Sequence, residues 1–417
     1  MPTTSLLVRQ VRPIGFATPT PAKPIDLLID PDGRIAAVGP RVAAPADARL
    51  LEGRGAYISP GWVDLHTHVW WGGTSGSIRP EECGAIRGVT TIVDAGSAGE
   101  ATFKGFREFI VKPARERVLA FLNIGSIGLA AGNRVPELQD IRFVDIDRTI
   151  ACVEANRDVI IGIKIRASHV ITGSWGITPV KVAKKVAKIL KLPLMVHVGE
   201  PPPLYDEVLD VLTAGDVVTH CFNGKQGGSI AEDEDLFQLA ARCAADGIRL
   251  DVGHGAASFS FKVAEIAIRR GLPPFSISTD LHVRSLDGPV WDMATTMSKV
   301  MALGLDLEDV IRASTTAPMQ VCQLPTDNLL SPGTRAELTL FDLVDADLQV
   351  LDSMRAPVRM QRIIEPRATI LGAEAIPASR HQAPPQALCT CCGQALPTSS
   401  QSQSQSATPR PTGVPRP

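Results

Sequence analysis

The stretch Pro60–Gly73, "PGWVDLHTHVWWGG", decides the fold because it sets two histidines two residues apart within an apolar run. Such a run is typical of a strand, and side chains two apart on a strand share a face. One face is predicted to hold Asp64, His66 and His68. The other face is predicted to hold Val63, Leu65 and Thr67. Two imidazoles on one face can bind a single metal ion, but a hydrogen-bonded core pair explains the pattern equally well.

Further strand-like runs follow, spaced widely enough for a helix between each pair. Counting the first, the runs lie at 63–69, 88–96, 118–126, 159–168, 192–200, 216–222, 248–255 and 274–281. This alternation predicts an α/β fold, a (β/α)8 or TIM barrel, over residues 59–325. The segment 181–191, "KVAKKVAKILK", predicts a helix with an apolar stripe of Val182, Val186, Ile189 and Leu190. Its lysines favour a solvated outer helix over a polyanion site.

The segments on either side of the barrel are rich in β patterns. Residues 1–58 contain short strand-like runs broken by turns such as "DPDGR", and 326–375 return to strand patterns, most regularly in "SPGTRAELTLFDL". Residues 376–417 contain "SSQSQSQS" and no aromatic, Lys, Asp or Glu residue, so they are predicted to be a disordered tail. The "CTCC" at 389–392 could bind a soft metal, but exposed thiols are favoured.

Composition excludes several classes of partner. Lys and Arg number 42 against 44 Asp and Glu, so a net charge of −2 gives no reason to expect nucleic acid or an anionic membrane. No apolar window is long enough for a membrane span, and the N-terminus has no secretory pattern. The eight cysteines are scattered, which predicts free thiols in a reducing cytoplasm. Formation of a homo-oligomer stays open.

The run "VIIGIKIRAS" at 159–168 favours a reactive site over a hydrogen-bonded core pair of histidines. Alternation predicts that Lys164 and Arg166 point into the barrel with Gly162, while the isoleucines face the helices. A bare ammonium inside a barrel costs several kcal/mol. Three solutions exist: a salt bridge, a lowered pKa suited to Schiff-base chemistry, or reaction with CO2 to give a carbamate that resembles a carboxylate ligand.

Later strands add more polar residues to the same interior. Alternation predicts inward positions for His197, for His220 on the face of Val218 and Phe222, and for Asp280 on the face of Ser276 and Ser278. Each lies near the C-terminal end of its strand, where barrel active sites are built. Four histidines, a lysine and an aspartate from five strands are hard to explain as ordinary core residues. The sequence therefore predicts a metal centre.

These residues carry a resemblance to a known family. "GWVDLHTH" with Lys164, His197, His220 and Asp280 resembles the amidohydrolase superfamily of binuclear metal hydrolases, over nearly all of residues 1–375. The resemblance implies a distorted barrel beside a small β-sandwich domain built from 1–58 and 326–375. "SPGTRAELTLFDL" is similar to the returning strand segment, with Glu337 where an aspartate is common.

The resemblance also implies a ligand set and a reaction. One metal would lie on His66 and His68 and a second on His197 and His220, with zinc as the default ion. Lys164, carbamylated by CO2, would bridge the metals, and Asp280 would complete the first site and act as the catalytic proton acceptor. A hydroxide bridging the two metals would hydrolyse an ester or amide without a covalent enzyme intermediate.

Substrate choice depends on weaker signals. Dihydroorotases of the superfamily usually carry an arginine two residues after the second histidine, where this chain has Trp70, expected to be a substrate contact. The runs "VDLHTHVWWGGTSG", "IGIKIRAS", "DVGHGAASFSF" and "SISTDLH" instead resemble a deacetylase subgroup. Its members act on acetylated α-hydroxy acids and, more weakly, on N-acetyl-D-amino acids. The implied partner is thus a small acylated acid.

Two further contacts and two rival functions remain open. Arg166 is a candidate for binding a substrate carboxylate, with pairing to a barrel acid an equal alternative. His254 has the wrong parity for a ligand and is a candidate substrate contact. A cyclic-amide hydrolase of the dihydroorotase or hydantoinase type would use the same metals. A non-catalytic scaffold related to dihydropyrimidinase would lack ligands, whereas all six ligand positions are filled here.

Overall fold

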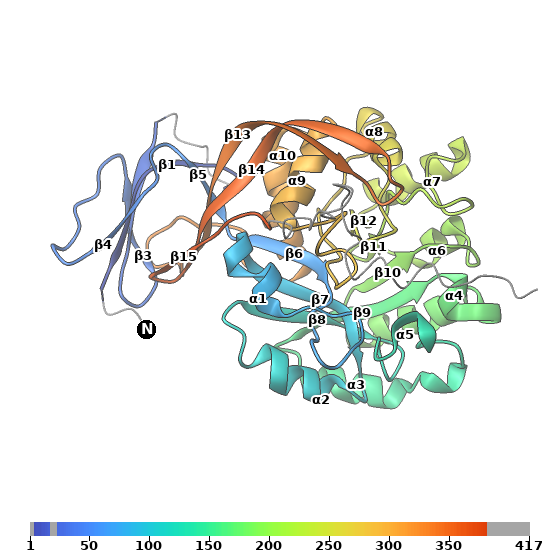
Figure 1. Cartoon of the computed structure of the whole chain (residues 1–417). Helices are drawn as coiled ribbons and strands as arrows, with labels where there is room; N and C mark the ends of the chain where they lie inside the picture. The colour runs from blue at the N-terminus through green and yellow to red at the C-terminus, as the bar shows by residue number, and fades with distance from the viewer. Residues whose placement is uncertain (1–3, 17–22, 382–417) are drawn as a thin grey trace, which may run out of the picture. The chain divides into compact units, whose positions relative to one another are not determined.

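A curled, parallel sheet carries the candidate site. The computed structural model describes residues 4–16 and 23–381. The sheet has seven strands in the order β12-β11-β10-β9-β8-β7-β6 (Figure 1). Its strands are β6 (Trp62–Thr67), β7 (Val89–Gly99), β8 (Arg117–Asn123), β9 (Ile160–Ala167), β10 (Leu194–Val198), β11 (Val217–Thr219) and β12 (Arg249–Asp251). Seven of the eight predicted barrel strands therefore form, in a sheet that keeps their sequential order.

The eighth predicted strand, 274–281, is an extended segment without a regular ladder. It makes single parallel bridges to both edges of the sheet, Asp251 with Ser276 and Thr67 with Leu281. The Asp64 carboxylate accepts a hydrogen bond from the Thr279 N–H at 3.0 Å, where a strand carbonyl would otherwise accept it. The prediction of eight regular strands is therefore confirmed for seven strands and not for this segment.

Helices connect the strands and cover the outer side of the sheet. They are α1 (Pro80–Cys83), α2 (Phe103–Phe106), α3 (Ile146–Glu154), α4 (His169–Thr172), α5 (Thr178–Leu190), α6 (Tyr205–Val211), α7 (Glu234–Ala245), α8 (Phe261–Arg269), α9 (Met293–Ala302), α10 (Leu307–Ser314) and α11 (Thr316–Val321). The predicted helix at 181–191 corresponds to α5. Its buried stripe differs from the prediction, since Ile189 is 51% exposed and Lys184 is buried in an ion pair with Asp216.

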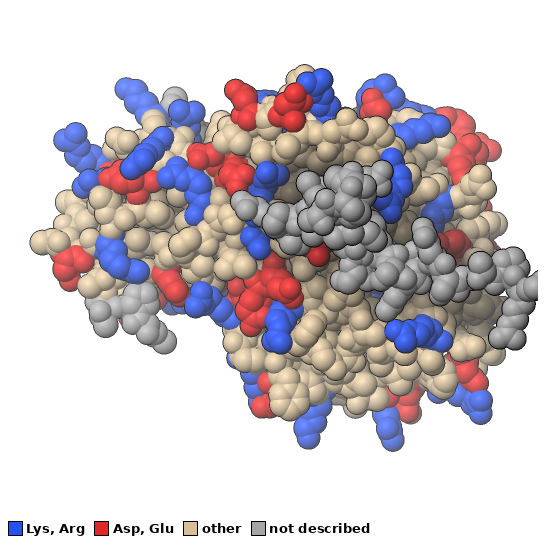
Figure 2. Space-filling model, in the orientation of Figure 1, with Lys and Arg blue, Asp and Glu red and all other residues tan. Residues whose placement is uncertain are grey.

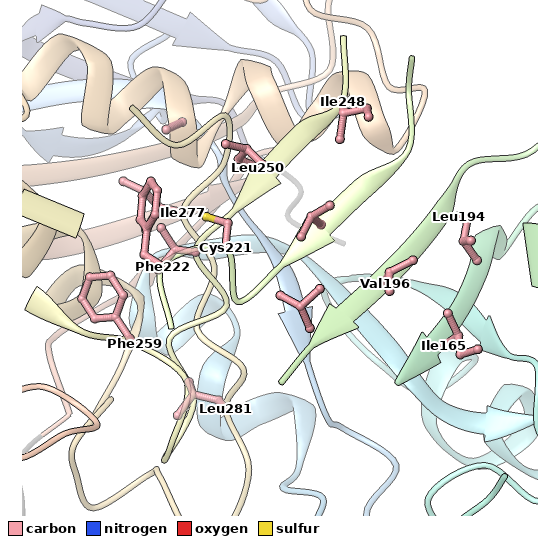
Figure 3. Close-up of a cluster of buried hydrophobic side chains, with 14 of the residues drawn as sticks. Ile165, Leu194, Val196, Cys221, Phe222, Ile248, Leu250, Phe259, Ile277 and Leu281 are labelled. Atoms are coloured by element: carbon pink, nitrogen blue, oxygen red, sulfur yellow. The ribbon is translucent and has the colours of Figure 1, made fainter. Parts of the chain in front are cut away.

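Apolar side chains fill both sides of this sheet. The larger cluster lies between strands and helices, and Figure 3 shows part of it, where Leu250, Cys221, Phe222 and Ile277 approach one another. A smaller cluster, which includes Phe121 and Met195, lies on the inner side, where Met195 Sδ accepts a hydrogen bond from Lys164. The site therefore rests on an apolar floor and is walled by buried strands.

The second sheet joins the two ends of the described chain. Its order is β15-β14-β13-β5-β1-β2-β3, with β4 paired to β1. Its strands are β1 (Leu6–Pro13), β2 (Ile25–Ile29), β3 (Ile35–Gly39), β4 (Arg49–Glu52), β5 (Tyr57–Pro60), β13 (Glu337–Leu351), β14 (Pro357–Leu371) and β15 (Glu374–Pro377). The antiparallel pairing of β5 with β13 brings the segments before and after the barrel together.

The predicted start of the tail at 376 is too early. Strand β15 continues to Pro377, and backbone hydrogen bonds tie Ala378 to Arg367 and Ser379 to Ile86. These residues pack against the body because their backbone groups find partners there. Residues 382–417, with the "CTCC" at 389–392, lie outside the described residues. The five described cysteines are free, as predicted for them.

The hairpin β13–β14 reaches from the second sheet to the barrel. Figure 1 shows its two ribbons running past α9 towards α8. The Ile364 N–H donates to Ser298 Oγ on α9 at 2.9 Å, and the Phe261 N–H at the start of α8 donates to Asp352 at 2.8 Å. The hairpin tip, residues 352–356, is thus held against the loops at the C-terminal ends of the strands.

The surface carries charges of both signs. On the face drawn in Figure 2, lysine and arginine residues are interspersed with aspartate and glutamate, in keeping with the near-zero net charge. Within the described ranges, no helix is long and apolar enough to cross a membrane.

Candidate metal centre

Three predicted ligands converge on one point at the mouth of the curled sheet. His66, His68 and Asp280 each offer one ligand atom, and these atoms all lie within 4.8 Å of one another. Asp280 Oδ1 lies 3.4 Å from His66 Nε2 and 3.1 Å from His68 Nε2. Nitrogen and carboxylate oxygen donors arranged in this way suit a divalent ion such as zinc.

His66 reaches this point through an irregularity in β6 that simple alternation does not predict. Val63 and Leu65 belong to the inner cluster with Met195, although alternation places them against the helices. The pairing of β6 with β7 shifts register between Asp64 and Thr67, which is the mark of a β-bulge. The extra residue lets His66 follow Leu65 to the inner side. Asp64 does not join the cluster and instead binds Thr279.

His220 and His197 form a second pair beside the first group. His220 Nε2 lies 2.9 Å from His197 Nδ1, and the rings of His220 and His66 are 5.1 Å apart. The predicted alternation on β11 is wrong, because Val218 and Phe222 pack in the outer core. His220 turns inward through a left-handed backbone, with φ +66°, which reverses the direction of its side chain.

Lys164 lies between the two histidine groups. It is 1% exposed, and its Nζ lies 3.3 Å from His66 Nε2 and 3.5 Å from Met195 Sδ. Burial lowers the pKa of Lys164 to about 7, although Asp280 and Asp251 act in the opposite direction. A substantial fraction of the side chain is therefore the free amine at neutral pH, which is the form that reacts with CO2.

The Nδ1 atoms of three imidazoles are held from behind, so that each Nε2 is aimed at the site. His66 Nδ1 lies 2.8 Å from Thr219 Oγ1, which in turn donates to Asp251. His68 Nδ1 lies 2.9 Å from Ser97 Oγ. The Nδ1–H of His220 donates to the carbonyl of Gly253 at 2.6 Å. Metal-binding histidines are oriented in this manner, because the outer hydrogen bond fixes both tautomer and ring plane.

The donor set has the protonation states that a cation needs. Burial and nearby Lys164 lower the pKa of His66 well below its usual value, and burial lowers the pKa of His220 to about 3. Burial opposes ionisation of Asp280, but His66 and the hydrogen bond from His68 outweigh it and hold its pKa well below the usual range. Neutral imidazoles and an ionised carboxylate are the forms that bind metal.

Arg166 lies at the edge of the site in an ion pair. Its guanidinium donates to both oxygens of the fully buried Glu137, at 2.8 and 2.6 Å, and to Asn133 at 2.9 Å. The structure thus contains the pairing with a buried acid that the sequence left as an equal alternative. Arg166 remains 13% exposed. Three of its five N–H groups are used by these partners, so two are left for a ligand.

The other two candidate substrate contacts, Trp70 and His254, are both buried. Trp70 is 9% exposed and packs in the outer core, 6.1 Å from the ring of Phe106. The Val69 N–H is held by Asp94, which turns the chain outward directly after His68. His254 is fully buried, with Lys299 on its Nε2 and Gly255 O on its Nδ1. Their roles as substrate contacts stay predictions.

Several residues that support the site have no signal in the sequence pattern. Thr219, Ser97, Asp251, Glu137 and Lys299 act through contacts with residues 29 or more positions away. Of these residues, only Thr219 lies next to a predicted ligand in the sequence, directly before His220. Asp94 supports His68 indirectly, since its carboxylate accepts a hydrogen bond from the Ser97 N–H at 2.7 Å.

Similarity to known proteins agrees with this geometry. A protein named deacetylase from Agrobacterium fabrum is 62% identical over 376 residues, 90% of this chain and 92% of the relative. A deacetylase from Enterococcus faecalis is 35% identical over 354 residues, 84% of this chain and 95% of the relative. No protein-family model matches the chain.

Solved structures extend the comparison. One described as a dihydroorotase has a TM-score of 0.89 at 61% identity, covering 91% of this chain and 99% of its own. One described as an adenine deaminase has a TM-score of 0.81 at 33% identity, covering 90% and 100%. Enamidase, described as a member of the amidohydrolase superfamily, has a TM-score of 0.61 at 18% identity over 92% and 98%, which supports the fold alone.

Identity at this level along most of both chains shows that the protein belongs to the amidohydrolase superfamily. It is a hydrolase acting on amide or ester bonds. More particularly, it groups with relatives that carry the name deacetylase and match it along 84% or more of its length. The group of His66, His68 and Asp280, which the resemblance implies as metal ligands, is present here.

Proposed function

We propose that the protein is a metal-dependent deacetylase that releases acetate from small acetylated acids, either O-acetylated α-hydroxy acids or N-acetyl-D-amino acids. The observation that carries the proposal is the convergence of His66, His68 and Asp280 beside a buried amine, Lys164. The name of relatives 62% and 35% identical to this chain supports the choice of an acetyl group.

The residues fit two divalent ions, with zinc as the default. His66, His68 and Asp280 would hold one ion, and His197 with His220 would hold the other. Two such ions lower the pKa of a bound water and polarise the scissile carbonyl. The fit rests on unprotonated donors, because the pKa values of His66, His197 and His220 all lie below the usual histidine value, mainly through burial.

Lys164 would contribute as a carbamate. Its free amine adds to CO2, forming an N–C bond and releasing one proton, and the product carries a negative charge. This conversion removes a costly buried ammonium and supplies carboxylate oxygens between the two histidine pairs. The position of Nζ, 3.3 Å from His66 Nε2, supports a bridging role.

Asp280 would move the proton during hydrolysis. Its carboxylate accepts a proton from the attacking water and returns it to the leaving oxygen or nitrogen as the acyl bond breaks. The products are acetate and the free hydroxy or amino acid. The lowered pKa of Asp280 keeps the carboxylate ionised at neutral pH.

Arg166 would hold the carboxylate of the substrate. Glu137 and Asn133 fix the plane of the guanidinium, and two N–H groups remain for a second, bidentate partner. The position two residues after His68, where dihydroorotases carry an arginine, offers no such contact, because Trp70 packs into the outer core. This supports an open-chain acid over dihydroorotate.

A cyclic-amide hydrolase is the second candidate. The observation in its favour is the structure described as a dihydroorotase, which is 61% identical to this chain. Ring amides and open-chain esters need the same metal chemistry, so the two candidates differ in substrate fit.

Parallel assays separate the candidates. Zinc-loaded protein is tested with acetyl-(R)-mandelate, N-acetyl-D-amino acids, dihydroorotate and hydantoins. We expect acetate release, a loss of about 10²-fold or more in kcat for Asp280→Asn, and no loss for the exposed control Asp235→Asn on α7. Preference for the cyclic substrates would favour the second candidate. An absence of turnover on all four would overturn both.

A further inference from the structure

His254 lies in the turn that follows β12, between two glycines with left-handed backbones. Gly253 has φ +47° and Gly255 has φ +56°. The Nδ1–H of His254 donates to its neighbour's carbonyl, Gly255 O, at 2.9 Å, so its Nε2 carries the lone pair. The ring packs 4.8 Å from that of Phe259 and is fully buried. The side chain is therefore locked, although it does not face the metal cluster.

Lys299 on α9 donates a hydrogen bond to the lone pair of His254 Nε2. Its Nζ donates to His254 Nε2 at 2.9 Å, to Leu351 O at 2.9 Å and to Pro289 O. An ammonium has three donors, and these three acceptors match them. Lys299 is fully buried, so the free-energy cost of burying its ammonium group is offset only while all three acceptors are in place. The lysine thus joins the turn after β12 to the end of β13.

The hairpin tip, residues 352–356, makes a second connection to the same turn. Ser353 Oγ donates to Gly255 O at 2.7 Å and lies 3.2 Å from His254 O. The Ser353 N–H donates to Phe259 O at 3.1 Å. Ser353 therefore contacts the backbone carbonyls of His254, Gly255 and Phe259 in the segment that follows β12.

The turn 253–255 in turn contacts two residues of the candidate metal centre. Gly253 O accepts the hydrogen bond from His220 Nδ1 that aims the imidazole. The backbone of Gly255 is so close to Asp280 that a Cβ there would lie 2.3 Å from Asp280 Oδ2. A shift of this turn would move the acceptor of the His220 Nδ1–H and change the space beside Asp280.

We propose that Lys299 and Ser353 are positioning residues of the metal centre, which hold the turn 253–255 against His220 and Asp280 through the hairpin tip. Neither residue touches the cluster itself. The second sheet thereby contributes to the geometry of a site built on the first. The inference rests on the proposed metal centre, but it concerns residues that no ligand role requires.

The test measures metal release from zinc-loaded protein in excess chelator, together with hydrogen exchange of residues 249–261 in metal-free protein. We expect Ser353→Ala and Lys299→Met to release zinc about tenfold faster or more, and to exchange the turn amides faster even without metal. Ser353→Thr should restore the slow release, because it keeps the hydroxyl. Lys184→Met is the matched control, since Lys184 is also a buried lysine but pairs with Asp216 on another face.

The outcomes are separable. A wild-type protein that binds no zinc would overturn the proposed function. Wild-type binding with unchanged release and exchange in both variants would overturn the inference alone. Should Lys299→Met fail to fold, Ser353→Ala with its threonine rescue decides the question. If Lys184→Met accelerates release as much as Ser353→Ala, the effect is general destabilisation and the inference is wrong.

Discussion

Lys164 shows how position gives a common side chain unusual chemistry. A strand carries it into an interior where Met195 and His66 are its nearest polar partners. None of the hydrogen bonds of Nζ is to a carboxylate, so the ammonium is poorly compensated and the amine is favoured. Lys184 is buried as well, but it forms an ion pair with the carboxylate of Asp216.

Replacement of Lys164 tests its bridging role. We expect Lys164→Ala to lose most of its bound metal and its turnover, because the two histidine groups are left without a shared anionic ligand. Added formate, acetate or propionate should restore part of the turnover. Metal analysis and rate measurements check this, with Lys184→Ala as the buried-lysine control. Normal metal content in Lys164→Ala would contradict the bridging role.

The burial of Lys164 also predicts a pH-dependent stability in metal-free, CO2-free protein. The folded pKa of about 7 lies below the ordinary lysine value of 10.5, so the unfolded state binds more protons between these values. The destabilisation of the folded state by the buried Lys164 ammonium is greatest below pH 7. It decreases by about 1.4 kcal/mol per pH unit as the pH rises towards 10.5. Lys164→Met should therefore be more stable than wild type at pH 7, by a margin that shrinks with rising pH. Denaturant unfolding measures it, and a margin independent of pH would be inconsistent.

The candidate ligands are positioned by the ends of the strands and by irregularities within them. The apolar runs predict seven of the strands correctly, because strand periodicity is a local property, and they also predict that polar residues gather at the C-terminal ends. Alternation fails at His66 and His220, since a β-bulge and a left-handed residue depend on pairing partners elsewhere in the chain. The segment 274–281 forms single bridges to both edge strands, and Asp64, distant in sequence, accepts a hydrogen bond from the Thr279 N–H.

Substitution of Gly255 tests how closely the turn 253–255 packs against Asp280. Gly255→Ala would force a Cβ to 2.3 Å from Asp280 Oδ2 at φ +56°, so we expect loss of metal and of turnover as Asp280 is displaced. Gly271→Ala is the matched control, because Gly271 also has a positive φ, +80°, but nothing lies within 4 Å of its Cβ position. The control should lose stability by about 1 kcal/mol and keep its metal. Equal metal content in both variants would count against the packing argument.

The whole molecule joins residues that are far apart in the chain. The candidate ligands run from His66 to Asp280, and the hairpin β13–β14 connects the second sheet to their support. The family resemblance implies a sheet shared by both ends of the chain, and the pairing of β5 with β13 confirms it. Of the implied ligands, His66, His68 and Asp280 lie together, and the full ligand set stays a prediction. The identity of Glu137 as the acidic partner of Arg166 and the burial of Trp70 and His254 could not be predicted, because each depends on contacts formed only in the folded chain.

A metal bound by such dispersed residues should stabilise the entire fold. Because the unfolded chain cannot assemble the site, zinc at a thousandfold excess over its Kd should add about 4 kcal/mol to the free energy of unfolding. We expect scanning calorimetry to show a higher Tm for zinc-loaded protein than for chelated protein, by several degrees. The His197→Ala variant should show a smaller rise. Equal Tm values with and without zinc would mean that folding and metal binding are not linked.

The central claim is that acetate release depends on metal held by this cluster. The most direct measurement titrates metal-free protein with zinc and follows acetate release from acetyl-(R)-mandelate or an N-acetyl-D-amino acid. The account predicts no release without metal and a rise to a plateau near two zinc ions per chain. Undiminished release from the chelated protein, or none at saturating zinc on either substrate, would contradict it.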